Sequence, residues 1–268
     1  MVMTNKKLYK FLEVAAQSGI QIVRIGTKEL AFRPERFDNA FREMLQTFNN
    51  RYPNIHIIFV VHFSHPDEFI ERDSEGNYIC DGHGMRWLSV VHAAVTSLRS
   101  FDFVTLENQT PMIDRVNDDP QTLRILHQEL RAAGIRTKYI FQCREIEGHR
   151  AFAVPLEKAW SIYNESQKGL SDSARSRFVM ATEDGKMEIV GMIPGSSQAK
   201  IASFLSPATS TGKTASEEGV IIFKMHRAPI GSNLLGALIV AQRNPDALWI
   251  TGYEDRLVYD GRKAQPDG

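Results

Sequence analysis

The sequence predicts an α/β fold in which parallel strands alternate with helices, as a parallel sheet or a (β/α) barrel. Short runs of β-branched residues recur along the first half of the chain, and segments with the helical period lie between them. The interval of roughly 35 residues is what a strand, a crossover helix and two loops require. With 268 residues and 43% apolar content, the chain can bury a sizeable core.

Each run is predicted to be a buried parallel strand, because it is rich in β-branched and other apolar residues and lies between segments with the helical period. The predicted strands are Ile20–Ile25, Ile55–Val61, Phe101–Leu106 and Ile135–Phe141. The predicted helices between them are Asn39–Asn50, Met85–Ser100 and Pro120–Gly134, the last ending at a glycine. The first part of the chain therefore repeats a β-α unit.

The second part departs from this alternation. A helix over Leu156–Gly169 precedes short strands at Arg177–Ala181 and Lys186–Val190. Residues Gly195–Glu218 are rich in Ser, Thr, Ala and Gly, which is typical of a flexible connection. A further strand is predicted at Gly219–Lys224, and the last ten residues are expected to fray. We expect a domain over residues 1–192, a flexible loop over 193–218 and a C-terminal, β-containing appendage over 219–268.

Charge and composition restrict the partners and the location. Lys and Arg total 32, as do Asp and Glu, so no bulk charge points to nucleic acid or to an anionic membrane. No apolar run is long enough to span a membrane and no signal peptide is recognisable, so we expect a cytoplasmic protein. The two cysteines, Cys80 and Cys143, are too few for a disulfide framework or for a three-cysteine metal site.

Polar side chains follow each predicted strand at the point where the strand ends. These junctions are Arg24–Lys28, His62–Pro66, Glu107–Pro111 and Gln142–Glu145, and in a (β/α) barrel they would converge on one mouth. Taken singly, each has an ordinary structural explanation. His62 and His65 are more often hydrogen-bonded loop residues than metal ligands. Arg24 and Lys28 are more often solvated or salt-bridged than bound to a phosphate or carboxylate.

Three of these segments together resemble a known family. RIGT at Arg24–Thr27, HFSHP at His62–Pro66 and NQTPMIDRVNDDP at Asn108–Pro120 occur in the order and spacing seen in lysine 2,3-aminomutase-like radical S-adenosylmethionine proteins. The similarity covers the chain from Leu8 to Gly191. It implies a partial (β/α) barrel and an enzyme that uses S-adenosylmethionine, a [4Fe-4S] cluster and pyridoxal phosphate. Such an enzyme moves an amino group between adjacent carbons of a small-molecule amino acid.

The resemblance also implies roles for individual residues. The adenosylmethionine contacts would fall on His62 and Gln109, with Ser64 and His65 as near neighbours. Lys186, which follows Asp184 and Gly185, would be the lysine that bonds to pyridoxal phosphate. A solvent-exposed lysine of a hairpin turn is an equally weighted structural alternative.

Two departures from the family pattern bear on the activity. Arg144 stands where the lysine-specific enzymes carry an acidic residue, and its charge should repel the distal ammonium of lysine, so an acidic, glutamate-like substrate is expected. The family also places a Cys-x-x-x-Cys-x-x-Cys segment ahead of RIGT, whereas the 23 residues before Arg24 contain no cysteine. We expect the chain to be inactive alone, and to need a second chain that supplies the missing strands and the cluster. A homo-oligomer is the other assembly considered.

Two further functions stay open from the sequence. One is a binding protein without a cluster that retains a pocket for S-adenosylmethionine or pyridoxal phosphate. The other is a metal-dependent (β/α)-barrel hydrolase that uses His62, His65 and Asp67.

Overall fold

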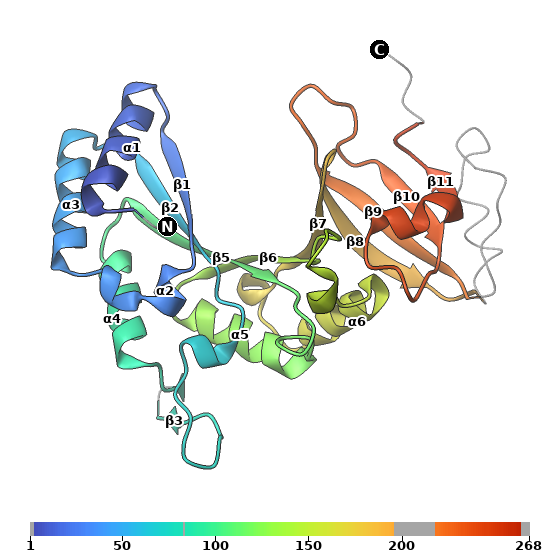
Figure 1. The fold of residues 1–268 in the computed structure, drawn as a ribbon, viewed down its shortest axis with the longest axis horizontal. Helices are drawn as coiled ribbons and strands as arrows, with labels where there is room; N and C mark the ends of the chain where they lie inside the picture. The colour runs from blue at the N-terminus through green and yellow to red at the C-terminus, as the bar shows by residue number, and fades with distance from the viewer. Residues whose placement is uncertain (1–2, 83, 196–217, 264–268) are drawn as a thin grey trace. The chain divides into compact units, whose positions relative to one another are not determined.

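The chain forms two compact units whose segments interleave along the sequence (Figure 1). The computed structural model describes residues 3–82, 84–195 and 218–263. The first unit comprises Met1–Thr110, Gln121–Lys138 and Gly169–Arg175, and the second comprises Pro111–Pro120, Tyr139–Lys168 and Ser176–Gly268. Each unit has its own helices and strands and is described separately.

The first unit is built on parallel strands in the order β1-β2-β5. Their bounds are Ile22–Thr27, His56–Val61 and Val104–Pro111, and β6, Arg136–Phe141, begins in this unit and ends in the other. All four predicted strands are confirmed within a few residues. β5 begins at Val104, later than predicted, because the Val104 N–H donates to the Phe101 carbonyl in a turn (3.2 Å).

Helices of the first unit cover the apolar face of these strands. The longer helices are α1 (Asn5–Gln17), α3 (Asn39–Arg51), α4 (Ser89–Arg99) and α5 (Pro120–Ala132). The short ones are α2 (Glu29–Phe32) and three 3-10 turns, at Pro34–Arg36, Pro66–Glu68 and Asp172–Ala174. α3 is capped by Asp38 and buries Phe41, whose ring lies 6.1 Å from that of Phe59 on β2. None of the helices in the described part of the chain is long and apolar enough to cross a membrane.

The predicted start of the helix after β2 is wrong. Met85 belongs to β4, Gly84–Met85, which pairs with β3, Cys80–Asp81, in a small hairpin. α4 therefore begins only at Ser89. Residues 70–87 form an insertion between the loop after β2 and α4, and the bridge between Ile70 and Trp87 closes it at its base.

The second unit is mostly antiparallel. The end of β6 pairs in parallel with β7, Arg177–Thr182, and β8, Gly185–Ile193, then pairs antiparallel with both β7 and β9, Val220–Arg227. β10, Leu238–Gln242, and β11, Leu257–Asp260, extend this sheet. α6, Leu156–Ser166, packs on it through Tyr163, whose ring stacks on Phe178. Short 3-10 turns lie at Arg150–Phe152 and Ile250–Arg256.

The C-terminal region is more ordered than predicted. β10 and β11 were not expected, and the expected frayed tail is wrong for the strand residues Tyr259 and Asp260. Most of the flexible loop expected at 193–218 lies outside the described residues, as do the last five residues of the chain.

The predicted α/β class is confirmed, and its parallel part carries the recognised motifs. Among the described strands, β1 pairs only with β2 and β11 only with β10, so both are edges. The sheet is therefore not closed into a barrel.

Candidate cofactor-binding site

One face of the strands in the first unit is polar. The register places Arg24 beside Ile58 and Thr105, and Gly26 beside Val60 and Glu107, so these residues share a face. Continuing this alternation, the polar side chains on this face are Arg24, His56, His62, Thr105, Glu107 and Gln109. The opposite face carries Ile57, Phe59 and Val61, which are fully buried. The polar face is thus the one that can meet a ligand.

The three motif segments meet at the carboxyl ends of β1, β2 and β5. The His62 imidazole hydrogen-bonds to the backbone of Gln109, and its Nε2 lies 3.9 Å from where a Cβ on Gly26 would stand. Burial, and then the charge of Lys28, lower the pKa of His62, which keeps the ring neutral near pH 7. In a neutral imidazole that donates to the Gln109 carbonyl, the second nitrogen can accept a hydrogen bond from a ligand hydroxyl or amine.

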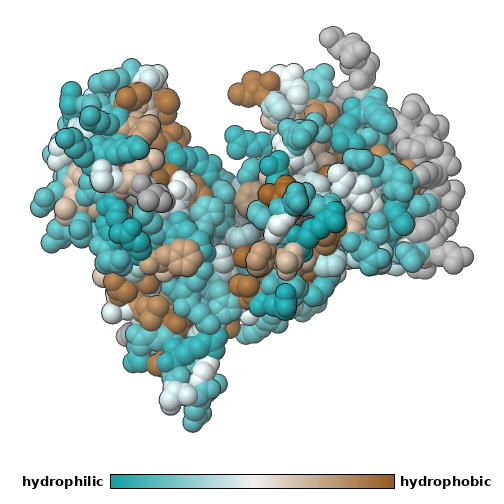
Figure 2. Space-filling view, in the orientation of Figure 1, coloured by the Kyte–Doolittle hydropathy of each residue, from teal (hydrophilic) through white to brown (hydrophobic). Residues whose placement is uncertain are grey.

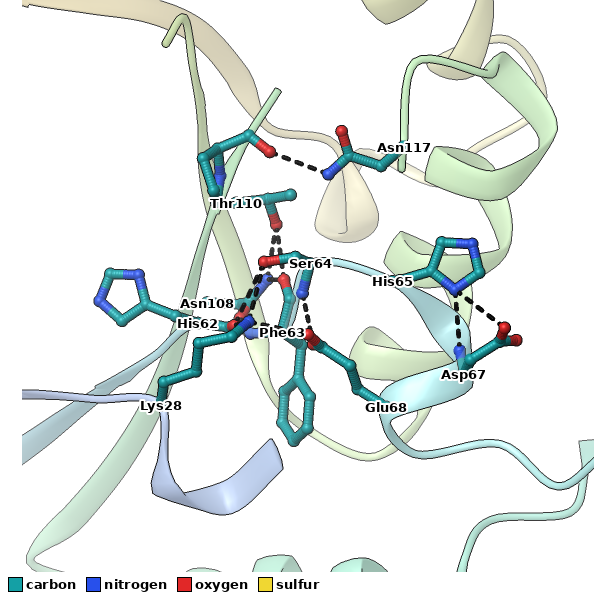
Figure 3. Close-up of polar contacts among 11 residues, drawn as sticks. Lys28, His62, Phe63, Ser64, His65, Asp67, Glu68, Asn108, Thr110 and Asn117 are labelled. Atoms are coloured by element: carbon teal, nitrogen blue, oxygen red, sulfur yellow. Dashed lines mark hydrogen bonds and ion pairs between the residues drawn. The ribbon is translucent and has the colours of Figure 1, made fainter. Parts of the chain in front are cut away.

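Lys28 ties the loop after β2 to the end of β1. Its Nζ donates to the His62 carbonyl (2.7 Å), to Ser64 Oγ (3.0 Å) and to Glu68 Oε1 (2.8 Å) (Figure 3). The other carboxylate oxygen of Glu68 accepts from the Ser64 N–H (2.7 Å). Ser64 is buried and serves this network, so its contacts in the structure hold the loop in place.

Asn108 and Thr110 hold the same loop from the side of β5. Asn108 Oδ1 accepts from the Phe63 N–H (2.9 Å), and its Nδ2 donates to the Phe63 carbonyl (3.1 Å). Thr110 Oγ1 donates to that carbonyl as well (3.0 Å). Asn108 is buried whereas the next residue, Gln109, is half-buried, so the two amides of the NQT motif have different tasks.

His65 lies on another side of the loop from His62 (Figure 3). Its Nδ1 accepts from the Asp67 N–H (3.2 Å), and Asp67 also bonds to Arg72 and Tyr78 of the insertion. Partial burial raises the pKa of Asp67, but the hydrogen bonds from Arg72 and Tyr78 outweigh it and hold the pKa below its usual value. His65 is thereby connected to the insertion.

A buried charge cluster lies on the same polar face, between the side chains of β1, β5 and β6. Glu107, 5% exposed, accepts from Arg24 (2.8 Å) and from Lys138 (3.1 Å). Arg24 is therefore engaged by a carboxylate. Sequence reasoning missed the roles of Glu107 and Lys138, although a glutamate directly before NQT, on a strand read as buried, was a signal that it needed a cationic partner.

Lys186 lies in the second unit, at the start of β8. It follows the turn that joins β7 to β8, as the hairpin alternative expected, but the side chain is half-buried. Its Nζ lies 4.3 Å from the Tyr139 ring centroid and 4.4 Å from that of Phe141. Gly185 permits this turn, because it has a φ of 129° and a Cβ there would stand 2.0 Å from the Arg227 carbonyl oxygen. An amine held beside two aromatic rings fits a flat, aldehyde-bearing cofactor.

Arg144 lines a cleft of about 530 Å³ within the second unit. The charged residues that line it are Arg144, Glu145, Glu183, Asp184, Glu254 and Arg262, and Trp249 forms part of its wall. Arg262 is paired with Asp260 and Asp184. The cleft therefore presents an arginine to a carboxylate and several acidic groups to an amine.

The residues present do not fit an iron–sulfur cluster. Cys80 is exposed in the insertion of the first unit, and Cys143 is in the second. In the described segments, no group of three or more His, Cys, Asp and Glu residues could hold a metal ion. His62, His65 and Asp67, the ligands of the hydrolase alternative, do not form such a group.

Comparisons with known proteins agree with the motifs. The chain is 30% identical over 259 residues to a putative L-lysine 2,3-aminomutase of Aquifex aeolicus, which covers 95% of the chain. It is 27% identical to the glutamate 2,3-aminomutase of Clostridioides difficile over 53% of the chain, and 27% identical to the L-lysine 2,3-aminomutase of Haemophilus influenzae over 55%. The chain is therefore similar to lysine 2,3-aminomutase-like proteins along nearly its whole length. No known family profile matches it.

The chain is shorter than these relatives. It spans 57% of the Aquifex protein, 28% of the glutamate enzyme and 37% of the Haemophilus enzyme. The relatives named for glutamate and for lysine both match, so the family assignment by itself leaves the substrate to be argued from residues.

Proposed function

We propose that the chain is the cofactor- and substrate-binding part of an aminomutase, an isomerase that moves an amino group between adjacent carbons of an amino acid. The observation that carries the proposal is the meeting of Gly26, His62 and Gln109 at the ends of three adjacent parallel strands. Ligands of α/β proteins bind at this end of the strands. The family's motifs coincide with this position.

S-adenosylmethionine is the ligand proposed for the first unit, in the mouth of a partial (β/α) barrel. His62 and Gln109 would contact it, while Lys28, Ser64 and Asn108 hold the loop that presents His62. His65, with Asp67, would border the same ligand. In this family the nucleotide is the source of the radical that abstracts a substrate hydrogen.

Pyridoxal phosphate is the ligand proposed for the second unit. Lys186 would hold it covalently, and its half-buried position beside Tyr139 and Phe141 supports this role. When bound, the cofactor supplies a conjugated π-system to the substrate nitrogen. What the chain itself contributes is an amine in a fixed position and two aromatic faces that exclude water.

An amino acid with an acidic side chain is the proposed substrate. Arg144 would bind the side-chain carboxylate, and the acidic residues of the cleft, among them Glu183 and Glu254, would favour the ammonium group. In a screen of amino acids, wild-type protein should bind glutamate or aspartate in preference to lysine, and Arg144→Ala should remove that preference. Arg175→Ala, an exposed arginine that neither lines this cleft nor pairs with a residue that does, is the control. Preferential binding of lysine would contradict the assignment.

A second polypeptide is the proposed partner, because a cluster needs ligands that the described residues do not offer. The edge strand β1 and the adjoining α1 carry exposed apolar side chains, and Figure 2 shows apolar surface over this part of the chain. These residues are Phe11, Val14, Ile20 and Ile22, of which Ile22 is 58% exposed. An unpaired edge flanked by apolar side chains favours strand addition. The partner would bring a cysteine segment and a strand parallel to β1.

Nucleotide binding tests the proposal directly. Calorimetry should detect S-adenosylmethionine binding by the wild-type protein and a loss of at least about tenfold for His62→Gln or Gln109→Ala. His56→Gln is a matched control, because His56 lies on the same face of β2 at the opposite end and bonds to Thr105 (2.7 Å). Equal binding by wild type and His62→Gln would contradict the nucleotide assignment.

A binding protein without a cluster is the second candidate, favoured by the presence of only two cysteines in the sequence. Both candidates should bind S-adenosylmethionine. They differ when a polypeptide that carries the Cys-x-x-x-Cys-x-x-Cys segment is added with iron and sulfide under reducing conditions. Iron–sulfur absorbance and amino-group migration that appear only in the mixture would support the aminomutase, and their absence would leave the binding protein.

A further inference from the structure

An irregularity in the strand beside Lys186 places a histidine next to its aromatic neighbours. Along the β8–β9 ladder, Lys186 pairs with Arg227 and the next residue, Met187, pairs with Met225. His226 is therefore the extra residue of a β-bulge. Bulges re-aim side chains and are frequent next to active sites, because the inserted residue is released from strict alternation.

The His226 side chain contacts Tyr139, one of the two aromatic residues beside Lys186. His226 Nε2 lies 3.2 Å from the Tyr139 hydroxyl, and the two rings meet edge to face with centroids 5.9 Å apart. On its other side, His226 Nδ1 lies 3.8 Å from Glu188 Oε2, which also accepts from Arg177 (2.9 Å). Burial and then the charge of Arg177 lower the pKa of His226, so a neutral ring can accept a hydrogen bond from the Tyr139 hydroxyl at Nε2.

We propose that His226 is a positioning residue: through the Tyr139 hydroxyl it holds the Tyr139–Phe141 pair beneath Lys186 and so sets the direction of the lysine amine. This inference rests on the proposed function, in which Lys186 would hold pyridoxal phosphate. The neutral amine would supply the electron pair for a C=N bond to the aldehyde carbon, and the aldehyde oxygen would leave as water.

The geometry explains why such a residue is needed. A lysine side chain has several rotatable bonds, and its ammonium is attracted to aromatic faces. Tyr139 and Phe141 therefore fix the amine only while their rings are themselves fixed, with centroids 5.6 Å apart. The hydrogen bond to His226 restrains Tyr139 at its hydroxyl, at the end of the side chain that the strand backbone does not hold.

The position of the amine can be measured without any cofactor. Reductive methylation with ¹³C-formaldehyde labels the lysines, and ring currents should shift the Lys186 methyl signal upfield of that from exposed Lys224 on β9; Lys186→Arg assigns it. In His226→Leu and Tyr139→Phe the shift should fall by more than half, and the double variant should lose no more than either alone. His226→Gln keeps an acceptor for the hydroxyl and should restore the shift. An unchanged shift in both single variants would overturn the proposal.

A second readout separates this inference from the proposed function. Borohydride reduction in the presence of pyridoxal phosphate, followed by peptide mass spectrometry, should find the cofactor on Lys186, with several-fold less in His226→Leu than in wild type or His226→Gln. No adduct on Lys186 in the wild type, with the methyl shifts as expected, would reject the pyridoxal assignment alone. An equal adduct in His226→Leu and unchanged methyl shifts would reject the role of His226 alone.

Discussion

Asn108 binds the backbone of Phe63 at both its N–H and its carbonyl, across 45 residues of sequence. The pairing joins the NQT and HFSHP motifs through a side chain that contacts no solvent. The neighbouring Gln109 has its side chain on the polar face instead. Adjacent motif residues therefore divide between holding the loop and facing a ligand.

This division predicts opposite phenotypes for two neighbouring substitutions. Asn108→Ala should lower the free energy of unfolding by about 3 kcal/mol, because it leaves the buried Phe63 N–H unpaired and removes one of the two hydrogen bonds to the Phe63 carbonyl. Gln109→Ala should change it by less than about 0.5 kcal/mol and lower the affinity for S-adenosylmethionine. Urea denaturation measures the free energy of unfolding of each variant, and calorimetry on the folded proteins measures the affinity for S-adenosylmethionine. A stable Asn108→Ala variant would show that the bonds to Phe63 are dispensable.

The charge cluster around Glu107 should stabilise the first unit. Glu107→Gln removes the buried carboxylate that pairs with Arg24 and Lys138, and it should cost about 2 kcal/mol, discounted because Arg24 is partly exposed. Glu165→Gln breaks the exposed pair with Lys168 and should cost at most about 0.5 kcal/mol. Equal urea midpoints for the two variants would argue against a structural role of the cluster.

The acid sensitivity of the first unit should depend on His127. This side chain on α5 is buried, and burial lowers its pKa from 6.5 to about 4. Between these values the unfolded state binds the proton and the folded state does not, so stability is complete above pH 6.5 and falls as the pH drops toward 4. The loss at pH 4.5 should be about 2.5 kcal/mol.

Denaturation at pH 7.5 and pH 4.5 isolates that contribution. His127→Leu should show a smaller loss between the two pH values than the wild type, because its side chain has no proton to gain. His92→Leu, at an exposed position on α4, controls for the loss of an imidazole. A pH dependence of His127→Leu identical to that of the wild type would refute the assignment.

The hairpin that carries Lys186 should depend on Gly185. Gly185→Ala would place a Cβ 2.0 Å from the Arg227 carbonyl oxygen at a φ of 129°, and it should destabilise the second unit by at least about 2 kcal/mol. Gly231→Ala has a φ of 84° and open space around it, and should cost about 1 kcal/mol. Comparing the thermal unfolding of the two variants separates the cost of the close approach to the Arg227 carbonyl from the cost of the backbone conformation alone.

Local patterns were enough to locate the parallel strands and most helices. β2 is a run of β-branched and aromatic residues after His56, and α3 has a capping aspartate followed by Phe41, Leu45 and Phe48 at helical spacing. β10 and β11 were missed because they have only five and four residues, and pairing with the preceding strand, β10 with β9 and β11 with β10, stabilises them. The β3–β4 hairpin was missed because its strands have two residues each.

The α/β class, the three motifs and their order follow from the sequence alone, because they depend on neighbouring residues and on spacing. The tasks of the polar side chains follow from the tertiary contacts. In the structure, Lys28 and Asn108 hydrogen-bond to the backbone of the loop after β2. Arg24 pairs with Glu107, and His226 hydrogen-bonds to Tyr139. A hydrogen bond requires a donor and an acceptor about 3 Å apart, and an ion pair requires charges within about 4 Å. Residues tens of positions apart reach these distances through strand pairing and a bulge.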